Sequence, residues 1–208
     1  MHRPFSEFPD IARDPALHIM FEARKRVFVD LLGWDVPIVQ DTLEVDQFDD
    51  RFATYIVLTG HDGAHRASAR LLQTVRPHIL GSLFPGLCED AVPARQDIRE
   101  ITRFCIEPTL NRRERRRARN ELVSALADHA LSRGIAAYTA VAGESWFRQI
   151  SDFGWRCSPL GEARRIGSEQ LVALRIDIDA TTVTHLTESG IYVRRPYRAI
   201  ETEWGLAA

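Results

Sequence analysis

The fold is indicated most directly by residues 53–72, which read ATYIVLTGHDGAHRASARLL. Residues 53–59 and 64–72 are rich in β-forming side chains, and their polarity alternates with a period of two, which is typical of strands. The His61-Asp62-Gly63 triplet between them has the composition of a turn. We therefore predict a β-hairpin here.

Helical periodicity predicts three helices around this hairpin. The first spans residues 15–32 and ends at Gly33, the second spans 111–133 and ends at Gly134, and the third is a short amphipathic helix over 144–153. Residues 33–50 are mixed in polarity and are predicted to form a long loop, a kind of segment that often has a function.

Three further strands are predicted over residues 98–106, 135–142 and 171–178. Helices alternating with strands in this order favour an α/β (α+β) fold. We expect a three-layer α/β/α arrangement with a mixed central sheet, as in the core of N-acetyltransferases.

The composition is that of a globular protein: 208 residues, of which 45% are hydrophobic and 27% charged. We expect one domain, with an N-terminal helix and loop over 1–50, a core over 51–180 and a C-terminal extension of unknown role over 181–208. The net charge of -2 gives no reason to expect nucleic-acid or membrane binding.

The cysteine and histidine patterns exclude several classes of site. The three cysteines are widely spaced, which fits a reduced cytoplasm, and neither a zinc-type Cys/His spacing nor an HExxH motif occurs. The first residues lack the apolar core of a signal peptide, and no apolar run reaches membrane-spanning length. We expect a cytoplasmic protein without a metal or membrane anchor.

Residues 24–50 hold the densest set of functional side chain types. Arg24 and Phe28 are four residues apart and share a helix face, and the segment also contains Trp34, Glu44, Asp46, Asp49 and Asp50. Aromatic rings, carboxylates and a guanidinium together suit a zwitterionic ligand that carries an adenine and a cationic centre. The alternative is a solvated acidic loop beside a core aromatic pair.

The strand over residues 98–106 contains the motif Arg99-Glu100-Ile-Thr102-Arg103-Phe104. Unless a bulge intervenes, alternation places Glu100, Thr102 and Phe104 on one face and Arg99, Arg103 and Cys105 on the other. Glu100 is a candidate general base. The alternative is an ion pair on the strand face.

The predicted helix at 111–133 begins with six arginines within eight positions. Such a run is ordinarily a solvated helix face, and RNA binding ranks low because no aromatic residues are interleaved. Guanidinium groups also bind phosphates and carboxylates, so the run suits a phosphopantetheine arm and an acidic carrier protein.

These motifs, taken in order, resemble the LuxI-type autoinducer synthases over about residues 20–180. The resemblance rests on Arg24-x-x-x-Phe28, Gly33-Trp34-Asp35-Val36-Pro37, Glu44-x-Asp46-x-x-Asp49-Asp50, Ala67-Ser68-Ala69-Arg70-Leu71, Pro77-His78-Ile79-Leu80, Phe84-Pro85 and Glu100-x-Thr102-Arg103-Phe104.

The resemblance implies an acyl-homoserine-lactone synthase used in quorum sensing. Such an enzyme joins an acyl thioester to S-adenosylmethionine, a co-substrate rather than a cofactor, and releases methylthioadenosine. The donor implied is acyl carrier protein, with acyl-CoA as an alternative. A related N-acyltransferase that acylates another amine, and a binding or regulatory domain, are the rival hypotheses.

The resemblance also implies roles for particular residues. Glu100 and Arg103 are expected to be catalytic, and Arg70 and Glu44 to form structural ion pairs. The expected S-adenosylmethionine-binding residues are Arg24, Phe28, Trp34, Asp46, Asp49, Thr102, Arg103 and Phe104. The expected acyl pocket consists of Thr139, Val141, Trp146 and Phe147, and the expected donor-docking residues are Arg112, Arg113, Arg115 and Arg116.

Overall fold

The computed structural model describes residues 14–201, which fall into two compact units. Unit 1 contains residues 14–70, Arg103–Leu122 and 196–201, and unit 2 contains Leu71–Thr102 and Val123–Arg195. Strands β4 and β5 and helix α4 contribute residues to both units.

Unit 1 begins with helix α2, Pro15–Arg24, which continues into a π-helical segment, η2, Lys25–Leu31. The Asp14 side chain caps α2 by accepting the Ala16 N–H at 2.9 Å. Gly33 ends the segment with φ of 68°, as predicted. The predicted helix is confirmed, but its second half is wound as a π-helix, a rare form that periodicity does not distinguish.

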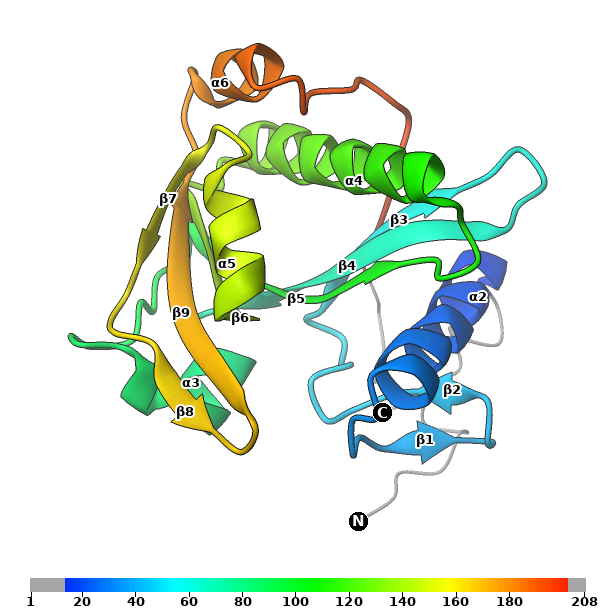
Figure 1. The fold of residues 1–208 in the computed structure, drawn as a ribbon, viewed down its shortest axis with the longest axis horizontal. Coiled ribbons are helices and arrows are strands. Elements are labelled where there is room, and N and C mark those ends of the chain that lie inside the picture. Colours follow the sequence, from blue (N-terminus) through cyan, green and yellow to red (C-terminus); the bar gives the residue numbers. More distant parts are fainter. Residues whose placement is uncertain (1–13, 202–208) are drawn as a thin grey trace, which may run out of the picture. The chain divides into compact units, whose positions relative to one another are not determined.

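The predicted loop at residues 33–50 is wrong in part, because it contains a two-stranded hairpin. Strands β1, Ile38–Val39, and β2, Leu43–Glu44, are antiparallel. Gln40 and Asp41 form the turn with φ of 51° and 59°, the left-handed conformation of primed hairpin turns. Each strand has two residues, too few for alternation to be recognised. Figure 1 shows the hairpin beside α2.

The remaining strands of unit 1 include the predicted hairpin, which is confirmed. Strands β3, Thr54–Thr59, and β4, His65–Gln73, are neighbours, and the Gly60 N–H donates to the Ala64 carbonyl at 2.8 Å across their turn. A strand that the sequence did not predict, β10, Arg198–Glu201, pairs antiparallel with β3. In unit 1 the C-terminal extension therefore forms the edge of the sheet.

Unit 2 confirms the prediction of a mixed sheet. Strand β5, Ile98–Ile106, has the predicted bounds and runs parallel to β6, Ala137–Gly143. Strand β9, Glu169–Asp177, is antiparallel to β6. Two short strands that were not predicted, β7, Arg156–Pro159, and β8, Arg164–Ile166, pair antiparallel with β9.

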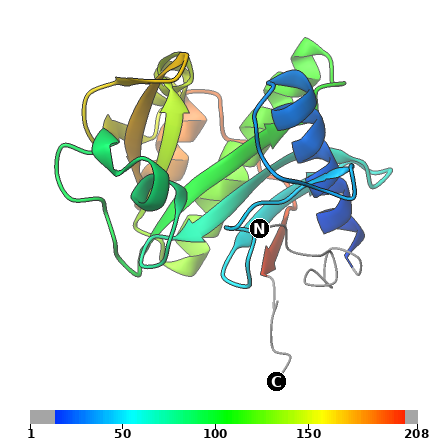
Figure 2. The same ribbon diagram turned by 90° about the horizontal axis from the view of Figure 1, so that it is seen from below.

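Helices cover both faces of the sheet in unit 2. On one face, the Tyr138 hydroxyl donates to the Leu126 carbonyl of α4, Arg112–Arg133, at 2.9 Å. On the other, Val141 packs against Leu80 of α3, Ile79–Leu83. Figures 1 and 2 both show α3 near β8 and β9. The predicted three-layer order is therefore present in unit 2.

Three more helices complete unit 2: η3, Pro85–Leu87; α5, Glu144–Ser151; and α6, Thr182–Glu188. Of these, only α5 was predicted. Along residues 14–201, no helix combines the length and the apolar character needed to cross a membrane.

Candidate functional site

Unit 1 contains a buried network of three guanidinium groups and three carboxylates. The arginines come from α2, β4 and β5, and the acids come from β2 and the turn after it. Opposite charges are equal in number, so the network is neutral. Its members are Arg24, Arg70, Arg103, Glu44, Asp46 and Asp49.

Asp49 is the centre of this network. Arg24 binds both of its carboxylate oxygens at 2.8 Å, and Arg70 approaches at 2.8 Å. The Tyr55 hydroxyl and the Asp46 N–H each donate to Asp49 at 2.8 Å. Burial alone would raise the pKa of Asp49, but the two guanidiniums and these hydrogen bonds hold it far below its usual range. Asp49 is therefore a buried anion.

Glu44 links Arg24 to Arg103. It accepts from Arg24 Nε at 2.6 Å and from Arg103 Nη2 at 2.9 Å. Burial opposes ionisation here too, and the two charges outweigh it, so the pKa of Glu44 is lowered. Arg70 binds Asp46 at 2.6 Å and 3.0 Å. Arg70 and Glu44 thus both form ion pairs within the network.

Arg103 differs from the other two arginines in its backbone. Its φ of 50° is in the left-handed region, which costs a residue with a side chain about 1–3 kcal/mol. This turn in the strand interrupts the alternation on which the two-face arrangement of residues 98–106 was based. The side chain reaches Asp46 at 2.7 Å, and it is 9% exposed while those of Arg24 and Arg70 are at 1% or less. Arg103 is therefore the arginine at the edge of the network.

Two aromatic rings lie against Arg103. Phe28 and Trp34 stack with centroids 4.8 Å apart, and the Arg103 guanidinium is 5.4 Å and 5.7 Å from their centroids. The turn at Gly33 that ends the π-helical segment brings the two residues together, because the Trp34 N–H donates to the Phe28 carbonyl at 2.8 Å. Phe28 is buried and Trp34 is 38% exposed. A cation at the face of stacked rings is suited to a ligand with both a π system and a carboxylate.

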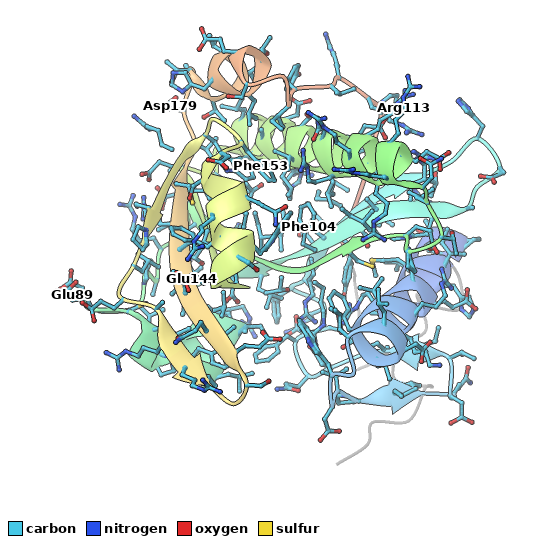
Figure 3. All side chains as sticks on the ribbon, viewed as in Figure 1. Glu89, Phe104, Arg113, Glu144, Phe153 and Asp179 are labelled. Atoms are coloured by element: carbon cyan, nitrogen blue, oxygen red, sulfur yellow. The ribbon has the colours of Figure 1, made fainter. Side chains whose placement is uncertain are left out.

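In unit 2, Glu100 is fully buried and anchors the start of α3. Its two carboxylate oxygens accept the N–H groups of Ile79 at 2.8 Å and Leu80 at 2.7 Å. Thr102 is also buried, whereas Phe104, which belongs to unit 1, is half-buried on β5 (Figure 3). Glu100, the candidate base, thus already accepts two backbone hydrogen bonds.

The four residues expected to form the acyl pocket lie in two places in unit 2. Val141 packs in an apolar cluster with Leu80, Leu87, Ala173, Phe84, Cys88, Val92, Leu160 and Leu171. Thr139 is on the same strand face, two residues earlier, and is fully buried. Trp146 instead packs edge-on against Phe153, 5.8 Å away, and Phe147 follows it on α5. The apolar cluster around α3 was not predicted.

The arginine run begins α4, and Figure 3 labels Arg113 on its first turn. Asn111 and Glu114 cap the helix: Asn111 Oδ1 accepts the N–H groups of Arg113 and Glu114 at 3.0 Å, and Glu114 accepts the Asn111 N–H at 3.1 Å. Of the four predicted docking arginines, Arg112, Arg113 and Arg116 are exposed and Arg115 is partly buried.

A polar chain that the sequence analysis missed lies elsewhere in unit 1. His65 Nε2 is 2.9 Å from Ser68 Oγ, and His65 Nδ1 is 3.7 Å from Glu107, which pairs with Arg26 at 2.8 Å. No sequence motif joins these residues, because they are up to 81 positions apart. Within residues 14–201, no group of three or more His, Cys, Asp or Glu side chains is arranged to hold a metal ion.

This chain should make the protein sensitive to acid. The neighbouring His65 and Arg26 lower the pKa of Glu107 from 4.5 to about 2. Because the native carboxyl binds its proton less readily than the unfolded one, its stabilisation is complete above pH 4.5 and is lost as pH falls towards 2. Burial lowers the pKa of His65 below 6.5. Because the folded protein binds this proton less readily than the unfolded chain, a second loss of stability begins as pH falls through 6.5.

The expected result is a urea midpoint that falls less between pH 4.5 and pH 2 in Glu107→Gln than in the wild type. Parallel curves for the two proteins would show that Glu107 does not cause the acid sensitivity.

Comparison with known proteins places these features in context. The chain matches the family model described as autoinducer synthase over residues 11–186. An acyl-homoserine-lactone synthase of Ralstonia nicotianae is 33% identical over 175 residues, covering 82% of this chain and 86% of that protein. One from Rhizobium etli is 34% identical over 148 residues, covering 70% of this chain and 69% of that protein.

Comparison with solved structures agrees with the comparison of sequences. TofI, crystallised in a ternary complex with an inhibitor and MTA, is 30% identical with a TM-score of 0.71, covering 84% of this chain and 92% of that chain. A putative N-acetyltransferase from Lactobacillus plantarum is 15% identical with a TM-score of 0.56, covering 80% and 94%. The second likeness is one of fold alone, and it agrees with the N-acetyltransferase-like core expected from the sequence.

Proposed function

The chain belongs to the autoinducer synthase family, and on that premise we propose that it is an acyl-homoserine-lactone synthase. The enzyme transfers an acyl group from a thioester to the amine of S-adenosylmethionine and then closes the lactone. The second product is methylthioadenosine, which corresponds to the MTA in the TofI complex. S-adenosylmethionine is consumed as a co-substrate, and both substrates are available in the cytoplasm.

The observation that carries this proposal is the cation-aromatic group of Arg103, Phe28 and Trp34 at the edge of the buried network. The rings offer a stacking surface for adenine, and the guanidinium offers a partner for the methionine carboxylate. The partly exposed Trp34 is the ring that a nucleoside reaches from solvent.

The other members of the network position Arg103 in this proposal. Arg24 and Arg70 are paired with the three buried carboxylates of the network. The role of these two arginines is to fix the carboxylates that bind the Arg103 guanidinium. Thr102 and Phe104 flank Arg103 on β5 and are assigned to the same binding region. Charges already held by buried partners need not reorganise when substrate binds.

The reaction then has two steps. In the first, the methionine amine attacks the thioester carbonyl, an amide C–N bond forms, and the thiol leaves. Glu100, or a water beside it, accepts the amine proton, and backbone N–H groups stabilise the oxyanion. In the second, a carboxylate oxygen attacks Cγ, the Cγ–S bond breaks, and the sulfonium becomes the neutral thioether of methylthioadenosine.

Thr139, Val141, Trp146 and Phe147 are assigned to the acyl chain in this proposal. The first two lie on the face of β6 where Val141 meets the apolar cluster around α3, and that face suits the chain. Trp146 and Phe147 lie on α5, so their assignment rests on the sequence resemblance alone.

The donor is proposed to be acyl carrier protein, with acyl-CoA as the alternative. The start of α4 supports this choice, because Asn111 already occupies the N–H groups of Arg113 and Glu114. A helix start is a favourable phosphate site when its N–H groups are free. We therefore assign recognition of the phosphate on the donor's phosphopantetheine arm to the guanidinium side chains. These side chains also suit the acidic surface of a carrier protein.

Reversing the charge of this patch should weaken donor binding specifically. With Arg112, Arg113, Arg115 and Arg116 replaced by Glu, the KM for acyl carrier protein should rise about 10-fold or more, because complementary charge steers association. The KM for S-adenosylmethionine should not change. The matched control is Arg164→Glu with Arg165→Glu on exposed β8. An equal rise in both KM values would contradict a donor-docking role.

The rival function is acylation of another amine without lactone formation, and a binding or regulatory domain is a third candidate. Release of methylthioadenosine and release of free thiol, measured together, separate all three. Purified protein is incubated with S-adenosylmethionine and a panel of carrier-protein and CoA thioesters, and free thiol and methylthioadenosine are quantified. Thiol without methylthioadenosine supports the rival, and release of neither supports the third candidate.

A further inference from the structure

Tyr55 is a neutral side chain that binds the buried charged network of unit 1. It lies on β3, is fully buried, and packs edge-on against Phe21 of α2 with the ring centroids 5.6 Å apart. Its hydroxyl donates to Asp49 Oδ1 at 2.8 Å. Burial and the charge of Asp49 raise the pKa of Tyr55 well above its usual range, so the hydroxyl keeps its proton and remains a donor.

The oxygen that Tyr55 binds is shared with two guanidinium groups. Asp49 Oδ1 also accepts from Arg24 Nη1 at 2.8 Å and lies 2.8 Å from Arg70 Nη1. Donors that meet at one buried oxygen share its negative charge, and removal of one strengthens the attraction of the others. Without the hydroxyl, Arg70 would therefore be drawn more strongly towards Asp49.

Arg70 connects this oxygen to Arg103. Its Nη1 is shared, because it also binds Asp46 Oδ1 at 2.6 Å. The other oxygen of Asp46 accepts from Arg70 Nη2 at 3.0 Å and from Arg103 Nη2 at 2.7 Å. If Arg70 moves towards Asp49, less of the charge on Asp46 is neutralised, and Asp46 attracts Arg103 more strongly. The Tyr55 hydroxyl thus acts on Arg103 through two ion pairs.

The consequence for a ligand depends on which nitrogens of Arg103 are in use. Its bonds to Glu44 and Asp46 are made by Nε and Nη2, so Nη1 is the nitrogen that can face a substrate carboxylate. A guanidinium held more tightly by its own carboxylates offers a weaker positive potential to an incoming anion. The balance of charge within the network therefore sets how well Arg103 binds a carboxylate.

We propose that Tyr55 is a positioning residue for S-adenosylmethionine, an inference that rests on the proposed function. The Tyr55 hydroxyl neutralises part of the charge on Asp49. Arg70 then stays on Asp46, and Arg103 Nη1 remains available to the methionine carboxylate. The effect should be confined to ligands that carry this carboxylate. Methylthioadenosine has the same nucleoside and no carboxylate, so it is the matched ligand that should not respond.

The test is calorimetric binding of S-adenosylmethionine and of methylthioadenosine to the wild type and to Tyr55→Phe. The Kd of S-adenosylmethionine should rise about 5-fold or more, the scale of one hydrogen bond lost next to a charged group. The Kd of methylthioadenosine should not change. In turnover, the KM for S-adenosylmethionine should rise while kcat and the KM for the acyl donor stay the same.

The matched control variant is Tyr192→Phe. It also removes a hydroxyl that donates to a carboxylate, that of Asp128 at 3.0 Å, but it does so in unit 2. Both Kd values should equal those of the wild type. A change in the ratio of the two Kd values would show that loss of any such hydroxyl alters binding, and it would overturn the specific role of Tyr55.

A double-mutant cycle tests the path to Arg103. In the Arg103→Lys background, Tyr55→Phe should raise the Kd of S-adenosylmethionine less than in the wild type, because both changes act on one group. A partly unfolded sample lowers the binding stoichiometry and leaves the ratio of the two Kd values unchanged. Additive effects, an equal loss for both ligands, or full affinity for S-adenosylmethionine in Tyr55→Phe would each overturn the proposal. Failure of the proposed function has a different signature, a wild type that binds S-adenosylmethionine but releases no methylthioadenosine.

Discussion

Arg103→Ala is expected to reduce methylthioadenosine release by at least about 100-fold, the scale seen when one charge-stabilising group is removed from an active site. The fold should survive, because each carboxylate that Arg103 contacts keeps a second guanidinium. Glu44 retains Arg24 at 2.6 Å, and Asp46 retains Arg70 at 2.6 Å. The measurement is kcat/KM for S-adenosylmethionine, with circular dichroism to check folding.

Arg103→Lys is the informative companion, because it keeps the charge and loses the fork that bridges Glu44 and Asp46. Its activity should lie between the wild type and Arg103→Ala. The free energy of unfolding of the alanine variant should fall only modestly, since Glu44 and Asp46 each keep a second guanidinium. Full turnover by Arg103→Ala would remove this residue from the site.

Arg24→Ala is expected to have the largest effect on stability, a loss of about 3–5 kcal/mol in the free energy of unfolding. Its side chain is 1% exposed and holds both Glu44 and Asp49. Without it, three carboxylates share two guanidiniums, and the excess negative charge is far from water. Domains are stable by only about 5–15 kcal/mol, so this variant should unfold at much lower urea concentration.

A matched control shows whether burial is the cause. Arg148 forms an ion pair of the same length with Glu144, at 2.6 Å, but the two side chains are 73% and 42% exposed. Arg148→Ala should therefore cost no more than about 1 kcal/mol. Similar urea midpoints for the two alanine variants would contradict the view that burial makes the loss of Arg24 costly.

Much of the fold was predictable because its longer elements repeat a pattern over many residues. Strand β5 was predicted with its observed bounds, Ile98–Ile106, since nine residues suffice to show alternation. The β1–β2 hairpin and β10 were missed because strands of two to four residues carry no period. The position of β10 also depends on β3, a pairing partner far away in the sequence.

The candidate site shows a similar division. The charged motif from Arg24 to Arg103 was identified from order and spacing, and the structure brings six of its residues into one network. Which arginine pairs with which carboxylate could not be predicted from the sequence. On the sequence alone, Arg24 and Asp49 are therefore as suited to bind a ligand as Arg103. The left-handed φ of Arg103 and the hydroxyl of Tyr55 on Asp49 have no sequence signal, because both depend on tertiary contacts.

The central claim is that the chain couples amide formation to lactone closure. The most direct measurement is the ratio of methylthioadenosine to free thiol released by the purified protein from S-adenosylmethionine and an acyl thioester. We predict one methylthioadenosine for each thiol, because every acyl transfer is followed by displacement at the sulfonium. Sustained thiol release with no methylthioadenosine would contradict the account.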